Sequence, residues 1–80
     1  MIEKEIKDSL LRLQEVSDVV VSESKHYNTF EVLMILKPNK PITAVWLEVI
    51  KNNYKFYYYE IQPGNNNQLI ITLYINGRNN

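Results

Sequence analysis

The sequence predicts a small α+β domain in which two helices cover one face of a four-stranded antiparallel sheet. Two observations carry this prediction. Apolar residues recur at helical spacing in segments 2–14 and 42–51, and four other segments are rich in β-branched and aromatic residues. These segments follow one another as helix, strand, strand, helix, strand, strand. At 80 residues, the chain has the length of one domain.

The first predicted helix spans residues 2–14. Its apolar side chains form a single stripe, as expected for a helix that packs on a core, and they are Ile2, Ile6, Leu10 and Leu13. Three consecutive valines then favour a strand over residues 18–23, and a polar loop follows. Alternating apolar residues favour a second strand over 29–37.

The segment PNKP, residues 38–41, interrupts the strand pattern and precedes the second predicted helix. Asn52 and Asn53 are expected to end this helix. Its expected inward stripe consists of Ile42, Val45, Trp46, Val49 and Ile50. We therefore expect the Trp46 side chain to lie in the core.

The third strand is the aromatic segment YKFYYYE, residues 54–60, and the fourth is QLIITLYIN, residues 68–76. Between them, Pro63 and Gly64 fit the central positions of a type II turn. The second and fourth strands are the most apolar, so we place them at the centre of the sheet. The resulting strand order, 1-2-4-3, is that of a ferredoxin-like sheet whose first strand has moved to the end of the chain. Residues 1–76 form this domain, and residues 77–80 are expected to be a frayed tail.

Strand alternation predicts which side chains lie on the sheet face that the helices leave open. Phe56 and Tyr58 are expected to face the helices. The side chains expected on the open face are Val20, Leu33, Ile35, Tyr57, Tyr59, Ile61, Ile70, Thr72 and Tyr74. Four strands about 17 Å long give this face a footprint of roughly 320 Å². Apolar patches of this size on soluble proteins are often functional.

The sequence is consistent with three interpretations of the open face. In the first, a second copy of the chain or an unidentified protein packs on it, and the expected interface residues are Leu33, Ile35, Tyr57, Tyr59 and Tyr74. In the second, bases of a single-stranded nucleic acid stack on Tyr57 and Tyr59, with Lys37 and Lys55 near the phosphates. In the third, the tyrosines only cover a small core and bind no partner. The chain carries nine acidic and nine basic residues, a balance that lacks the positive charge of typical nucleic-acid binders and favours the first interpretation.

Residue types that support catalysis are scarce. The chain has no cysteine and two glycines, and its one histidine, His26, falls in a polar loop with no expected catalytic partner. We therefore expect a non-enzymatic protein with no metal and no cofactor.

The charged first residues and the lack of a long apolar run predict a cytoplasmic protein with no membrane segment. The abundance of Asn, Lys, Ile and Tyr suits an AT-rich coding sequence, as in viruses and mobile elements.

Overall fold

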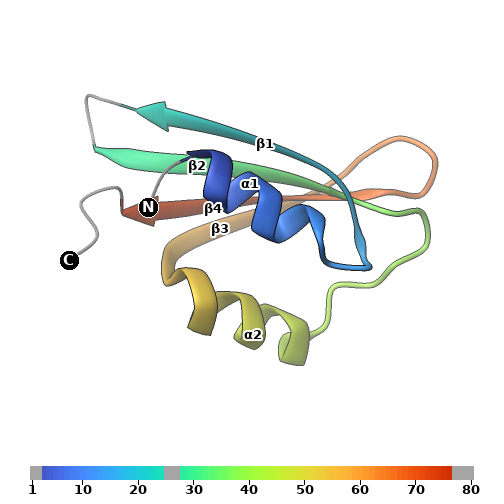
Figure 1. Ribbon diagram of the computed structural model, residues 1–80. Helices are drawn as coiled ribbons and strands as arrows, with labels where there is room; N and C mark the ends of the chain where they lie inside the picture. Colours follow the sequence, from blue (N-terminus) through green and yellow to red (C-terminus); the bar gives the residue numbers. More distant parts are fainter. Residues whose placement is uncertain (1–2, 25–27, 77–80) are drawn as a thin grey trace.

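A computed structural model describes residues 3–24 and 28–76 of the chain and shows two helices against a four-stranded sheet (Figure 1). The elements follow the predicted order, which is α1 (Glu3–Leu11), β1 (Val16–Ser24), β2 (Thr29–Leu36), α2 (Ala44–Tyr54), β3 (Phe56–Pro63) and β4 (Leu69–Asn76). Ile2, His26 and the expected tail, 77–80, lie outside the described residues. Neither described helix has the length and apolarity needed to span a membrane.

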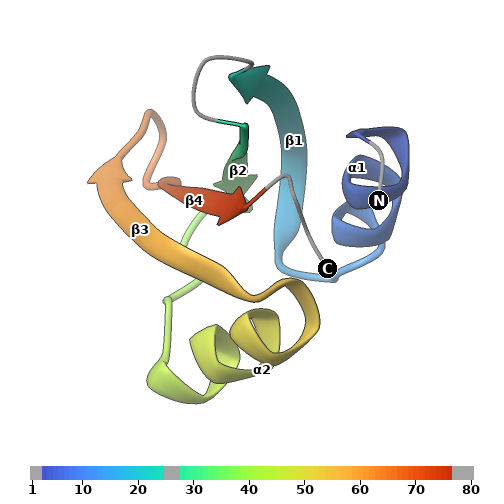
Figure 2. The same cartoon turned by 90° about the vertical axis from the view of Figure 1, so that its left-hand side faces the viewer.

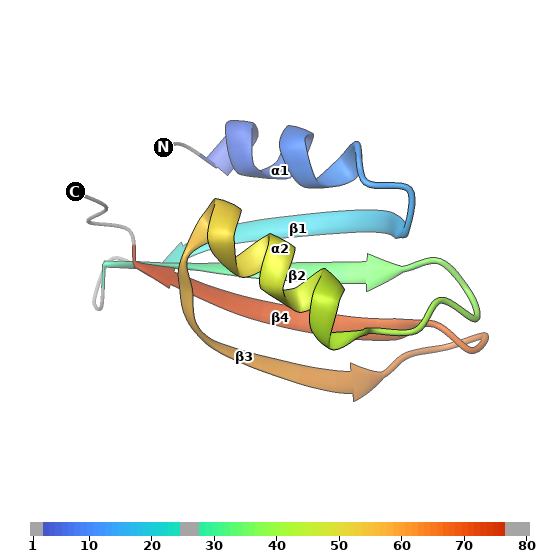
Figure 3. The same ribbon diagram turned by 90° about the horizontal axis from the view of Figure 1, so that it is seen from below.

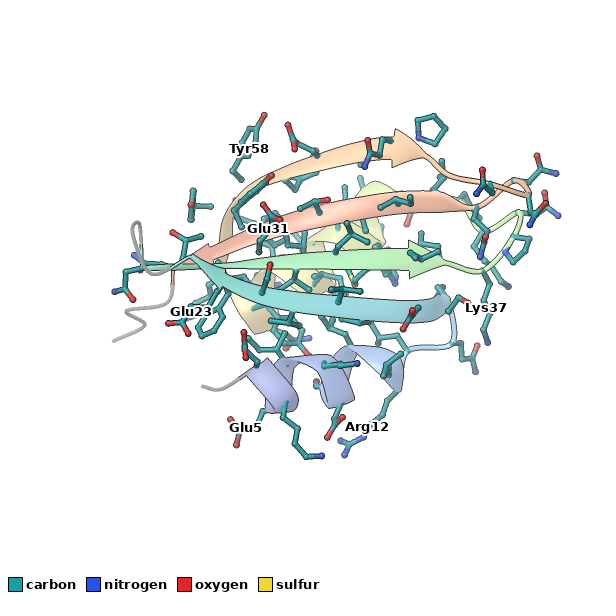
Figure 4. All side chains as sticks on the ribbon, turned by 90° about the horizontal axis from the view of Figure 1, so that it is seen from above. Glu5, Arg12, Glu23, Glu31, Lys37 and Tyr58 are labelled. Atoms are coloured by element: carbon teal, nitrogen blue, oxygen red, sulfur yellow. The ribbon has the colours of Figure 1, made fainter. Side chains whose placement is uncertain are left out.

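The predicted sheet topology is confirmed. Every neighbouring pair of strands is antiparallel, and the strand order is β1-β2-β4-β3. Seen end-on, the strands run from β1 to β3 with α1 beside β1 and α2 close to β3 (Figure 2). The view from below has α2 in front of the strands, and the opposite view has the strands in front of α2 (Figures 3 and 4). One face of the sheet is therefore open, as expected.

The core lies between the helices and the covered face of the sheet. β2 contributes alternate residues to it, as predicted, and β4 contributes the residues that pair with them. Ile6 and Leu10 anchor α1, with relative exposures of 1% and 0%. The buried apolar side chains are Ile6, Leu10, Val16, Val19, Phe30, Val32, Met34, Leu36, Ile50, Phe56, Ile71, Leu73 and Ile75. Leu13 is partly buried and packs against this cluster.

The second helix differs from the prediction in how it meets the core. Its N-cap is Thr43, whose Oγ1 accepts a hydrogen bond from the Trp46 backbone N–H at 3.1 Å. Ile50 is 1% exposed, but Val45 is 76% and Val49 49% exposed. The predicted inward positions of Val45 and Val49 are therefore wrong, and Trp46 is only partly buried. The short helix α2 therefore buries fewer side chains than its five-residue apolar pattern implies.

The end of α2 and the β3–β4 connection also differ from expectation. Asn52 and Asn53 do not end α2, which continues to Tyr54 and is capped by Lys55 in the left-handed region at φ 54°. In the β3–β4 connection, Gly64 has no positive φ, so the predicted type II turn at Pro63–Gly64 is wrong. Asn66 and Asn67 take the left-handed conformation instead, at φ 56° and 61°. Asparagine tolerates this region because its short polar side chain can hydrogen-bond locally.

Candidate interaction surface

A β-bulge at Tyr57 decides which aromatic side chains of β3 reach the open face. Phe56 pairs with Ile75 and Tyr58 pairs with Tyr74, so Tyr57 is an extra residue in β3. Beyond this point, alternation in β3 is shifted by one residue relative to an unbroken strand. Face assignments in β3 after Tyr57 that assume unbroken alternation are therefore reversed.

The bulge reverses three predicted assignments. Tyr58 was expected to face the helices, but it lies opposite Tyr74 on the open face and is 55% exposed. Tyr59 and Ile61 were expected on the open face. They pair instead with the buried residues Leu73 and Ile71, which places them on the helix side of the sheet.

The open face retains most of its other predicted members. Leu33 pairs with Thr72 and Val20, and Ile35 pairs with Ile70 and Asp18, so these side chains share one face. Thr72, at 7% exposed, is buried, whereas Leu33, Ile35 and Ile70 are partly exposed. From the pairing, the open face consists of Asp18, Val20, Ser22, Glu31, Leu33, Ile35, Tyr58, Glu60, Gln62, Ile70, Thr72 and Tyr74.

Tyrosines gather at one end of this face. The Tyr58 and Tyr74 ring centroids are 5.5 Å apart, and the Tyr57 hydroxyl lies 3.4 Å from Thr29 Oγ1. The Tyr74 hydroxyl donates a hydrogen bond to Glu60 Oε1 at 3.1 Å. Desolvation and this bond, together with the negative charges of Glu60 and Glu31, raise the pKa of Tyr74 from 10.0 to about 12. The hydroxyl of Tyr74 therefore stays protonated at neutral pH, where it acts as a fixed donor to Glu60.

The ionised groups of the open face are mainly acidic. Asp18, Glu31 and Glu60 are exposed on it. Figure 4 shows Glu31 and Tyr58 near one end of the sheet and Lys37 at the other. Lys55 caps α2 and lines a shallow hollow with Glu48 and Lys51, away from the open face. The structure therefore does not bring the two predicted phosphate-contacting lysines together with the tyrosines.

The two edge strands of the sheet, β1 and β3, differ in what lies beside them. Beside β1, charged side chains of α1 line a hollow next to Val20 and Val21, and they are Glu3, Lys4, Lys7 and Asp8. Figure 3 shows β3 running clear of both helices beyond its junction with α2. Tyr57, Tyr58, Tyr59 and Ile61 of β3 are 63%, 55%, 42% and 45% exposed. The exposed aromatic surface therefore continues from the open face around the β3 edge.

Sequence reasoning missed Tyr58 and Glu60 as members of this surface. An aromatic run fits a strand in either register, so the pattern itself held no signal for the bulge. Among the described residues, no group of three or more His, Cys, Asp or Glu side chains is placed to hold a metal ion. Comparison with protein-family models, curated proteins and solved structures gives no match to this chain.

Proposed function

We propose that this protein is a non-enzymatic association module that forms a homodimer through its tyrosine surface. By this name we mean Tyr57, Tyr58, Tyr59 and Tyr74, with Ile61 on the β3 edge and Leu33 and Ile35 on the open face. The observation that carries the proposal is the exposure of the three consecutive tyrosines of β3, at 63%, 55% and 42%. Tyrosine is enriched at protein interfaces because it supplies large apolar area together with a hydroxyl.

The charges support protein rather than nucleic acid as the partner. Stacked bases would bring phosphates near Glu31 and Glu60, and the hydroxyl of Tyr74 already bonds Glu60. Binding to single strands depends on Lys and Arg side chains that neutralise phosphates. Lys37 lies at the opposite end of the sheet from Tyr58 (Figure 4). Lys55 caps α2 and lies beside Glu48 and Lys51. Single-stranded nucleic acid, the second interpretation of the sequence, therefore becomes an alternative outcome of the test.

The test measures solution mass by light scattering over a range of protein concentrations. We expect a dimer for the parent and a weakened dimer for the double variant Tyr57→Ser, Tyr58→Ser. Aromatic anchors commonly cost about 2 kcal/mol or more when truncated, so two should raise the dissociation constant about a hundredfold or more. Val45→Ser is the matched control, because Val45 is 76% exposed but lies on α2.

The outcomes separate the interpretations. A parent that is monomeric at every concentration contradicts the proposed homodimer. A monomeric parent that binds short single-stranded oligonucleotides, and loses that binding in the tyrosine double variant, supports the nucleic-acid interpretation instead. Loss of dimer in the Val45→Ser control would show that the contact lies on the helix side.

A further inference from the structure

The β3 edge offers backbone hydrogen-bonding groups that β4 does not use. The Gly64 N–H donates to the Gln68 carbonyl at 2.7 Å, so the backbone of Gly64 faces β4. In an antiparallel pair, residues alternate between facing the partner strand and facing away. Gln62 and Glu60 therefore face β4, whereas Tyr59, Ile61 and Pro63 turn their backbone groups to the free edge. Proline has no N–H, but its carbonyl can accept a bond.

This edge lacks most of the devices that keep strand edges from pairing. Natural proteins guard edges with charged residues, especially lysine, with proline, or with a covering helix. The β1 edge is lined by charged residues of α1, whereas β3 carries no lysine, and its proline stands at the last residue of the strand. The remaining devices are the charged residue Glu60 and the bulge at Tyr57, which leaves the stretch from Tyr58 onward regular. This stretch is accessible for pairing.

We propose that β3 pairs with β3 of a second copy, antiparallel, so that two sheets join edge to edge into one continuous sheet. The proposal rests on the homodimer of the preceding section and confines its contact to the β3 part of the tyrosine surface, with Leu33 and Ile35 outside the contact. Stacking two open faces instead would bring the carboxylates of Asp18, Glu31 and Glu60 of both copies into one contact, with no lysine or arginine side chain of the open face opposite them. Burying unpaired carboxylates is unfavourable, so edge pairing fits the charges better.

Among registers centred on residues 59, 60 and 61, the side chains favour one. A twofold axis perpendicular to the sheet must pass midway between one residue of β3 and the same residue of the other copy, so that the two lie opposite each other. An axis at Glu60 would place two carboxylates directly opposite each other, which is destabilising. An axis at Tyr59 would place the bulged residue Tyr57 opposite Ile61 of the other copy. An axis at Ile61 avoids both problems, because residues 58–64 then pair with residues 64–58.

The register centred on Ile61 gives compatible neighbours at each position. Ile61 meets Ile61, and the Tyr59 ring meets the Pro63 ring on the helix side. On the open face, Glu60 meets the Gln62 amide, which can donate to it, and Tyr58 meets Gly64, which has no side chain to obstruct the ring. The contact is one strand wide, so we expect an interface below about 1,200 Å² in total, in the range of weak and transient complexes.

Single cysteines test the register directly, because the chain has no cysteine of its own. Residues opposite each other in a hydrogen-bonded pair have Cα atoms about 5.5 Å apart, within disulfide range. In the proposed dimer this holds for Ile61→Cys. In Tyr59→Cys, each cysteine lies opposite residue 63 of the other copy, so the two cysteines are four residues apart along the strands. This separation of about 14 Å is too far for a disulfide. Val45→Cys controls for random collision, since Val45 is more exposed than either.

The three variants are checked for fold by circular dichroism and then oxidised mildly at the concentration where the parent dimerises. Rapid interchain disulfide formation in Ile61→Cys alone is the expected result. A dimer by light scattering without that disulfide, or with equal cross-linking in all three variants, overturns edge pairing but leaves the proposed homodimer standing. Preferential cross-linking of Tyr59→Cys overturns the Ile61 register. A parent that is monomeric throughout overturns both the homodimer and this inference.

Discussion

Replacing Ile50 by alanine tests how α2 is attached to the rest of the domain. In α2, Ile50 is the fully buried side chain, at 1% exposed, and the other fully buried apolar residues of the core belong to α1 and the sheet. Truncating a buried isoleucine to alanine costs about 2–5 kcal/mol, because contacts are lost and a cavity remains. A domain of this length has a stability of roughly 4–12 kcal/mol, taking about 0.05–0.15 kcal/mol per residue. The substitution should therefore remove a large fraction of the total free energy of unfolding.

Thermal unfolding followed by circular dichroism measures this cost. In a domain of this size, each kcal/mol lowers Tm by about 4–8 °C, so Ile50→Ala should lower Tm by roughly 8–40 °C. Val49→Ala is the matched control on the same helix, because Val49 is 49% exposed and alanine is the better helix former. It should change stability by about 0.5 kcal/mol or less. If Ile50→Ala melts within a few degrees of the parent, or Val49→Ala costs as much, the assigned orientation of α2 is wrong.

Three further predictions concern caps and ionisation. Thr43→Ala removes the acceptor for the Trp46 N–H and should cost about 1 kcal/mol in chemical denaturation, whereas Thr43→Asn should retain most of the stability. Lys55→Gly should stabilise by about 0.5–1 kcal/mol, because Lys55 occupies the left-handed region at φ 54°; a destabilised variant would contradict the strain argument. The pKa of Tyr74 is raised to about 12, so its contribution to stability is present below about pH 10, the unfolded value, and is lost as the pH rises towards 12. Tyrosinate absorbance should show that Tyr74 titrates late and that Glu60→Gln moves this titration to lower pH, and an unchanged titration of Tyr74 would contradict the role of Glu60.

Much of the fold could be predicted from the sequence because local pattern and tertiary packing agree in α1, β2 and β4. The stripe of Ile6 and Leu10 and the alternation of β2 point to the core that the structure contains. Strand order followed from the apolar character of β2 and β4, since a central strand has neighbours on both sides.

The candidate site could be predicted only in part. Leu33, Ile35 and Tyr74 are on the open face as expected, but Tyr58 and Tyr59 are interchanged. The position of a bulge depends on how β3 leaves the left-handed cap at Lys55 and aligns with β4, and neither is encoded in a single strand's alternation. The stripe of α2 was overestimated for a related reason. Val45 lies one residue before Trp46, about 100° away around the helix, and it is 76% exposed.

The strand order has a consequence for the chain as it is synthesised. β1 and β2 form one hairpin and β3 and β4 another, and the two hairpins meet only along the β2–β4 ladder. These are the most apolar strands, so the half that leaves the ribosome first presents an unpaired, hydrophobic β2 edge until residues 69–76 emerge. Exposed edges of this kind promote aggregation. Slow translation between the two halves would prolong that exposure, whereas the finished fold buries both edges against each other.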